Sequence, residues 1–168
     1  MKSGMTRTKR LTADALLLTT AFILSWIEIM ISLPAAVPGI KIGLANLAIL
    51  FAMYYCGNAD AFFVLVGRII LSAFLFGNVS SLIIGAAGGM LSFAVMALSR
   101  KLFGKHIVYV SIMGGVFHNI GQLTAASFML GTSFIMLLPY LISGGIAAGA
   151  FNGIIADRIL KFSLTNPM

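Results

Sequence analysis

The chain has 168 residues, of which 60% are apolar and 9% are charged, and its formal net charge is +7. Soluble domains contain about 25% charged residues, so too few charged side chains are present to cover a water-soluble surface. The length allows about six membrane-crossing helices of roughly 20 residues each, which leaves no room for a separate soluble catalytic domain.

Long apolar runs without polar–apolar alternation predict membrane-spanning helices rather than the strands of a barrel. We expect an all-α integral membrane protein whose six transmembrane helices cover about residues 11–33, 42–55, 61–76, 79–98, 107–130 and 134–160. The second helix is short for a full crossing. The chain then divides into a basic N-terminal tail (1–10), one transmembrane domain (11–162) and a C-terminal tail (163–168).

The first apolar run follows a basic stretch, as the apolar part of a signal peptide does. It is longer than a signal peptide requires, because it continues for over 20 residues and contains Trp26 and Glu28. The small residues that follow it are flanked by Pro34 and Pro38. We therefore expect a retained first helix rather than a cleaved signal.

Nine of the eleven basic residues lie in three groups that an even number of crossings places on one membrane face. The groups are Lys2, Arg7, Lys9 and Arg10; Arg100, Lys101 and Lys105; and Arg158 and Lys161. Cytoplasmic loops carry an excess of lysine and arginine, so both termini are expected in the cytoplasm. Anionic lipid is then the nearest partner of the basic residues, and no nucleic-acid partner is expected.

The eighteen glycines are concentrated in the last three predicted helices. Gly85 and Gly89, and the series Gly145, Gly149 and Gly153, are spaced four apart, which places each set on one helix face. Small residues at this spacing allow helices to approach closely in lipid, and they also leave room for a ligand beside the backbone. No internal repeat is evident, so an inverted-repeat transporter is not supported.

Several polar side chains fall inside apolar helices, where they are costly and often functional. In the fifth predicted helix, three of them lie within five positions and share one broad stripe. We expect these and similar residues of the first three helices to line a polar pocket that opens outward. The predicted substrate site consists of Glu28, Lys41, Asn46, Arg68, His118, Asn119 and Gln122.

Arg68 lies near the middle of the third predicted helix and requires an anion, because a lone buried guanidinium is costly. Glu28 is the carboxylate available within the membrane, and an anionic ligand is the alternative partner. The amides of the site are likewise open to two interpretations. They bind a ligand, or they tie neighbouring helices together.

Motifs for catalysis and for cofactors are absent from the sequence. The single Cys56 excludes an internal disulfide, and His118 has no partner at metal-ligand spacing, so we expect neither a metal nor a cofactor. No phosphate-binding loop and no GxSxG sequence is present. The three aspartates, Asp14, Asp60 and Asp157, form no aspartate-rich motif. A non-catalytic protein is expected.

Two sequence elements resemble a known family. Residues 38–46 read PGIKIGLAN and residues 118–122 read HNIGQ, and Arg68 and the break after Phe76 accompany them. They resemble small bacterial membrane proteins labelled Gx transporter or heptaprenyl diphosphate synthase component I, over about residues 11–160. That family is similar to the substrate-binding S components of energy-coupling factor transporters.

The resemblance implies an S-component-like bundle in the bacterial plasma membrane, in which the loop after the first helix covers a small-molecule ligand. It also implies a separate coupling transmembrane subunit and separate ATPase subunits. The leading hypothesis is therefore a substrate-binding subunit for uptake of a small anionic, isoprenoid-like, quinone-like or vitamin-like molecule. The alternative is an accessory or anchoring subunit in isoprenoid or quinone metabolism, or in membrane electron transfer.

Overall fold

The computed structural model describes residues 6–31, 43–76, 79–104, 106–131, 133 and 135–165, and they are helical without any strand. The expected all-α class is confirmed. The elements are α1 (Arg7–Ile31), α2 (Asn46–Tyr55), α3 (Asn58–Phe76), α4 (Val79–Phe103), α5 (Ile107–Leu130), a 3₁₀ turn (Ile135–Leu137) and α6 (Leu138–Thr165).

Four of these helices are long and apolar enough to cross a membrane, which indicates a membrane protein. The candidate spans are Arg7–Glu28, Asn58–Leu75, Val79–Phe103 and Ile135–Ser163. A helix as short as α2, with 10 residues, rises only about 15 Å, half of the roughly 30 Å hydrocarbon core. The 24-residue α5 is long enough, but its polar stripe lowers its hydropathy. The count of six crossings therefore stays a prediction.

Several helix ends differ from the predicted ones by two to five residues, and those of α1 and α4 carry charged or capping residues. α1 begins at Arg7, four residues early, where the hydroxyl of Thr6 accepts a hydrogen bond from the backbone N–H of Lys9 at 3.4 Å. α4 continues to Phe103, so Ser99–Phe103, which were expected in a loop, are helical. Arg100 and Lys101 occupy its last turn, where cations interact favourably with the helix dipole.

The glycines of α6 pack directly on the backbone of α5, as the four-residue spacing predicts. A Cβ atom at Gly149 would lie 2.6 Å from the Cα of Ile112, and one at Gly153 would lie 2.8 Å from the Cα of Val108. Any larger side chain at these positions would push the two helices apart. The packing interpretation is confirmed for this face.

The glycines of α4 follow the prediction only in part. A Cβ atom at Gly85 would meet nothing within 4 Å, so the prediction that Gly85 packs against a helix is wrong. Its neighbour Gly88 makes the contact instead, because a Cβ atom on Gly121 of α5 would lie 2.9 Å from the Cα of Gly88. α5 is thus held closely by α4 on one side and α6 on the other.

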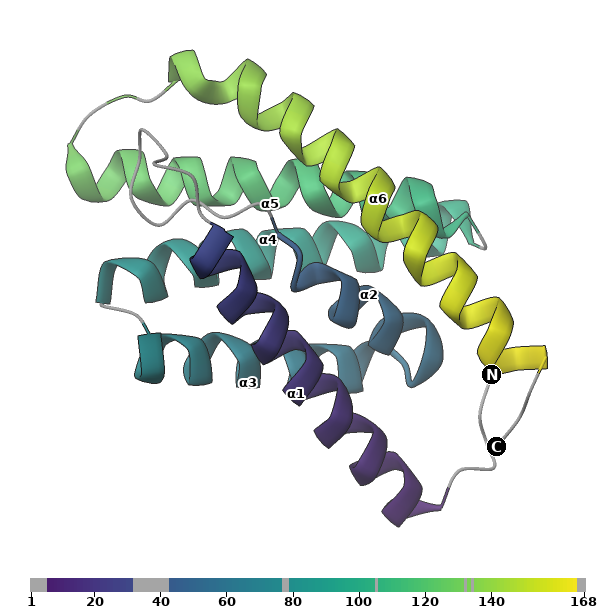
Figure 1. The fold of residues 1–168 in the computed structure, drawn as a ribbon. Coiled ribbons are helices and arrows are strands. Elements are labelled where there is room, and N and C mark those ends of the chain that lie inside the picture. The colour runs from purple at the N-terminus through teal and green to yellow at the C-terminus, as the bar shows by residue number, and fades with distance from the viewer. Residues whose placement is uncertain are drawn as a thin grey trace.

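The short helix α2 lies at the centre of the bundle and contacts α1, α3, α5 and α6 (Figure 1). Its residues Ile49, Leu50 and Met53 are fully buried, together with Leu65 of α3. α1 and α2 run antiparallel, because Glu28 near the end of α1 meets the start of α2 while Asp14 near its beginning lies beside Cys56. The core therefore surrounds α2.

The ends of several helices gather at one end of the bundle, on the right in Figure 1. Arg10 of α1 forms an ion pair with Asp60 of α3 at 2.6 Å. Arg100 of α4 donates a hydrogen bond to the Met53 carbonyl of α2 at 2.6 Å. The start of α1, the α2–α3 turn and the end of α4, with the basic residues they carry, therefore lie together.

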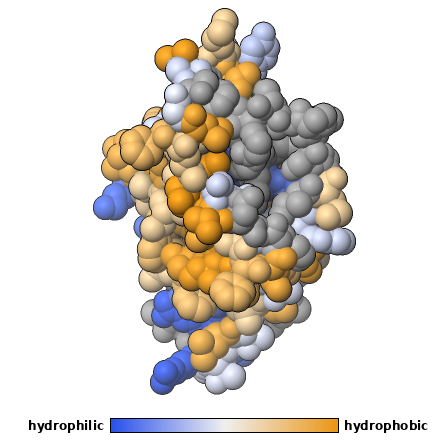
Figure 2. Space-filling view, turned by 90° about the vertical axis from the view of Figure 1, so that its left-hand side faces the viewer, coloured by the Kyte–Doolittle hydropathy of each residue, from blue (hydrophilic) through white to orange (hydrophobic). Residues whose placement is uncertain are grey.

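The remaining surface is largely apolar. The face in Figure 2 is dominated by hydrophobic side chains, and the few strongly hydrophilic ones lie mostly at its lower edge. Phe74 and Phe128 are 89% and 90% exposed. A soluble monomer rarely exposes large contiguous apolar patches, so this surface is suited to lipid.

Candidate functional site

The polar contacts of the interior centre on Gly43, which directly precedes the first turn of α2. Its N–H donates a hydrogen bond to Oε1 of Glu28, and the N–H of Leu44 donates to the same oxygen at 3.3 Å. Its carbonyl accepts from the N–H of Asn46 at 3.0 Å. Glu28 is thus held by backbone donors, and it fixes where α2 starts.

Gly43 must be a glycine for two separate reasons. Its φ of +92° lies in a region that residues with a Cβ atom rarely adopt. A Cβ atom there would also lie 3.2 Å from Nδ2 of Asn46 and 3.4 Å from Cδ2 of His118. Gly43 and Asn46 of the first motif therefore lie against each other, and His118 of the second motif lies beside Gly43.

Asn46 differs from the other polar residues around Gly43 in its side-chain hydrogen bonding. It is 6% exposed, and within the described residues neither Oδ1 nor Nδ2 has a hydrogen-bond partner. A buried polar group left without a partner costs about 1–3 kcal/mol, which a structural amide would ordinarily avoid. As far as the described part of the chain goes, Asn46 therefore has both a donor and an acceptor without a partner.

Asn152 of α6 joins the same group and was missed by the sequence analysis. Its Nδ2 donates to the Gly43 carbonyl at 3.1 Å, across 109 positions of the chain, while its Oδ1 has no partner among the described residues. A signal was present, because an asparagine between Gly149 and Gly153 is a polar residue inside an apolar helix. We call Glu28, Gly43, Asn46, His118 and Asn152 the Gly43 site.

Arg68 is buried beside this site, at 5% exposure. Its Nη1 lies 3.4 Å from the hydroxyl of Ser25, a residue the sequence analysis did not select. The carboxylate of Glu28 attracts the guanidinium electrostatically, and Nε of Arg68 has no hydrogen-bond partner in the described part of the chain. Arg68 thus adds a positive charge and an available donor to the interior.

The polar stripe of α5 divides between two neighbouring helices. Asn119 donates from Nδ2 to the Leu141 carbonyl of α6 at 2.7 Å, so it ties α5 to α6. Gln122 is fully buried against Gly88 of α4, whose Cβ position would lie 2.5 Å from its Cγ. Of the three stripe residues, His118 is the one that reaches Gly43. Lys41 lies outside the described residues.

An apolar groove of about 410 Å³ lies elsewhere, between α4 and α5. Its lining contains none of the predicted site residues and includes Ile83, Ala87, Leu91, Gly121, Thr124 and Phe128. The polar residues of the Gly43 site and this groove are therefore separate features. The predicted outward-opening pocket stays a prediction.

These observations define a class: a helical membrane protein with a buried polar site around the start of a short central helix. The chain belongs to the heptaprenyl diphosphate synthase component I family, whose model matches residues 17–159. The family resemblance carried by the two motifs is thereby confirmed. No curated protein and no solved structure matches the chain.

Proposed function

We propose that this chain is a non-catalytic, substrate-binding membrane subunit for uptake of a small molecule, similar to an S component. The observation that carries the proposal is Asn46, a buried amide whose donor and acceptor both lack partners among the described residues. Ligand sites combine apolar walls with a few fixed polar groups. Asn46 beside Gly43, held on the carboxylate of Glu28, is such a fixed group.

The ligand that suits these groups is small and carries hydrogen-bonding atoms on an otherwise apolar body. Asn46 offers a donor and an acceptor, Asn152 offers an acceptor, and Arg68 offers a charged donor from Nε. A charged donor forms stronger hydrogen bonds with anions than with neutral groups. An anionic head attached to an isoprenoid-like, quinone-like or vitamin-like body is therefore the preferred class, with Lys41 as a second cation.

The proposal includes six crossings in a bacterial plasma membrane with both termini in the cytoplasm. It is supported by the gathering of Arg10, Arg100 and their basic neighbours at one end of the bundle. Reporter fusions after residues 105 and 161 should both report a cytoplasmic location. An external signal from either fusion would contradict this topology.

The substrate site is tested by identifying small molecules that remain bound through purification. Native mass spectrometry of the wild-type protein should reveal a retained small molecule, and Asn46→Ala should lose it. Asn119→Ala is the matched control, because Asn119 is also a buried amide but donates to a backbone carbonyl. A molecule retained equally by wild type and Asn46→Ala would overturn the assignment.

A second function is favoured by the description of the family, which names a component of a heptaprenyl diphosphate synthase. On this hypothesis the chain is a non-catalytic accessory or anchoring subunit of isoprenoid or quinone metabolism. Gentle extraction followed by identification of co-purifying proteins separates the two hypotheses. ATPase and coupling subunits support uptake, whereas a prenyl-transferring enzyme or a redox enzyme supports the accessory role.

A further inference from the structure

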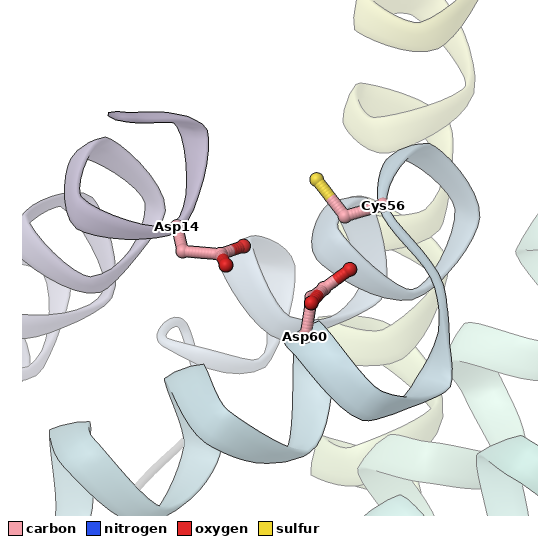
Figure 3. A group of neighbouring side chains, drawn as sticks. All are labelled: Asp14, Cys56 and Asp60. Atoms are coloured by element: carbon pink, nitrogen blue, oxygen red, sulfur yellow. The ribbon is translucent and has the colours of Figure 1, made fainter. Parts of the chain in front are cut away.

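A second group of chemically active side chains lies at the other end of α2. Asp14 of α1, Cys56 at the end of α2 and Asp60 in the first turn of α3 point toward a common space (Figure 3). One oxygen from each carboxylate and the sulfur of Cys56 all lie within 4.8 Å of one another. We call these three residues the Asp14 cluster.

The two carboxylates of the cluster are buried beyond what their visible partners explain. Asp14 is 8% exposed and Asp60 is 6% exposed. Arg10 donates from Nε and Nη2 to Oδ1 of Asp60, at 2.9 and 2.6 Å. Among the described residues, Oδ2 of Asp60 and Oδ1 of Asp14 have no hydrogen-bond partner. Arg10 therefore satisfies only one side of one carboxylate.

The net negative charge of the cluster favours a bound cation. Two carboxylates and one guanidinium leave an excess of one negative charge, and buried charges require pairing or a metal. A divalent cation bound by both carboxylates and by the thiolate of Cys56 makes the whole group neutral. The thiol proton is then released to water as the sulfur–metal bond forms.

We propose that the Asp14 cluster binds a divalent transition-metal ion, for which Zn²⁺ fits the donors best. Zinc accepts oxygen and sulfur ligands at about 2.0–2.3 Å in tetrahedral geometry, which places ligand atoms about 3.5 Å apart, so small side-chain rotations complete the site. A thiolate ligand selects against Mg²⁺ and Ca²⁺. Three protein ligands leave a fourth position open for water or another group.

The fold positions these ligands without any sequence motif. Cys56 is fixed because its backbone N–H donates to the Ala52 carbonyl at 2.8 Å at the end of α2, and it is half-buried, which leaves a route of entry. Asp14 comes from a different helix, so no ligand spacing appears in the sequence. The proposal therefore replaces the expectation that the chain binds no metal.

This metal site is independent of the proposed substrate site. Asp14 and Glu28 lie on the same helix, 14 positions apart, which corresponds to about 21 Å along α1. Cys56 and Asn46 lie at opposite ends of α2. Loss of the metal can therefore be measured without reference to the small-molecule ligand, and failure of either proposal leaves the other intact.

The test is metal binding by the purified full chain in detergent, carrying a tag without histidine. After treatment with a chelator, the protein is dialysed against Zn²⁺ in excess Mg²⁺, and bound metal is counted by mass spectrometry. We expect one Zn²⁺ per chain. With Co²⁺ as the probe, we expect a thiolate-to-cobalt charge-transfer absorption that disappears in Cys56→Ser.

Asp14→Asn and Cys56→Ser should each weaken Zn²⁺ binding by about 100-fold or more, since loss of outer-shell partners alone costs about 10–100-fold. Asp157→Asn is the matched control, because that aspartate pairs with Lys161 on α6 at 2.6 Å, away from the cluster. If the wild type binds no Zn²⁺, or if both cluster variants bind it as tightly as the wild type does, the proposal is wrong.

Discussion

The Gly43 site and the Asp14 cluster lie at opposite ends of the same central helix, but their buried carboxylates are paired to different extents. At the Gly43 site, the single carboxylate of Glu28 accepts hydrogen bonds from two backbone N–H groups and interacts electrostatically with Arg68. At the Asp14 cluster, two carboxylates converge and only Asp60 is paired with a cation, Arg10. The described groups of the protein therefore compensate the buried negative charge at the Gly43 site, whereas they compensate only part of it at the Asp14 cluster.

This difference indicates which kind of partner each end accepts. The groups without described partners are amides at the Gly43 site and a guanidinium N–H of the neighbouring Arg68, and they suit a molecule with both polar and anionic atoms. The groups left available at the Asp14 cluster are carboxylate oxygens, which attract a cation.

The largest expected effect follows removal of the buried cation near the Gly43 site. Arg68→Ala leaves the buried carboxylate of Glu28 without its nearby positive charge. Removing the opposite charge from the surroundings of a buried carboxylate is destabilising, so we expect the free energy of unfolding to fall by about 3 kcal/mol, the lower end of what a broken buried pair costs. Thermal and chemical unfolding of purified protein in detergent measure it.

The control for Arg68→Ala must be an arginine without a structural role. Arg158→Ala is suitable, because Arg158 is exposed on α6, and its effect should stay within about 0.5 kcal/mol. Equal, negligible effects of both substitutions would show that Arg68 compensates nothing. Arg100 is unsuitable as this control, because its guanidinium binds two groups of the bundle.

The second effect concerns the backbone that presents Asn46. Gly43→Ala combines an unfavourable positive φ, worth about 1–2 kcal/mol, with crowding of Asn46 and His118, so we expect a loss of about 2–3 kcal/mol. Gly104→Ala is the matched control, because its φ is +55° but nothing lies within 4 Å of its Cβ position. A loss for Gly43→Ala no larger than that for Gly104→Ala would mean that the Gly43 site is not tightly packed.

The third effect tests the end of α2 that carries Cys56. Arg100 donates to the carbonyl of Met53 at 2.6 Å and to Oδ1 of Asn58 at 2.7 Å, and it stacks on the Tyr54 ring with 4.8 Å between its Cζ and the ring centroid. Hydrogen bonds from charged donors contribute about 1.5–3 kcal/mol, so Arg100→Ala should lose about 1.5 kcal/mol or more.

The neighbouring Lys101→Ala provides the reference for Arg100→Ala, because it removes an exposed cation from the same helical turn. Both substitutions change the net charge equally, so a difference between them reports the contacts of Arg100. If Lys101→Ala destabilises the protein as much as Arg100→Ala does, the effect is one of surface charge and the end of α2 is not held by Arg100.

The sequence predicted the helical class and the bounds of α5, because a continuous apolar run between turn residues defines a helix locally. It did not predict the extension of α4 to Phe103. That extension places Arg100 on the end of α2, and the partner carbonyl of Met53 lies 47 positions away in the chain. Boundaries set by such contacts are invisible in a local pattern.

The candidate site was predictable as a set of residue types and only partly as a group in space. Asn46 and His118 both lie against Gly43, as expected. Asn119 instead donates a hydrogen bond to α6, and Gln122 packs against α4. These directions depend on how α5 rotates between its neighbours, which spacing along one helix does not determine. Asn152 was missed although it is a polar residue inside an apolar helix, and its contact with Gly43 spans 109 positions of the chain.

The smallest expected effect separates a ligand contact from a helix tie within one residue type. Asn119→Ala removes a hydrogen bond between α5 and α6, and such bonds contribute about 0.6 kcal/mol in membrane proteins, so the unliganded protein should lose about that much stability. Asn46→Ala removes an amide without described partners, so the unliganded protein should be unchanged or slightly more stable.

The two variants should behave oppositely when the small molecule found by mass spectrometry is added back. A ligand that binds only the folded state raises its stability with concentration, so Asn119→Ala should keep the full ligand-induced increase in melting temperature and Asn46→Ala should lose most of it. The difference follows from the structure, because the Nδ2 donor of Asn119 is already occupied by the Leu141 carbonyl, whereas neither polar atom of Asn46 has a partner among the described residues. A lower baseline with an undiminished ligand response in Asn46→Ala would make that residue a helix tie and remove it from the binding site.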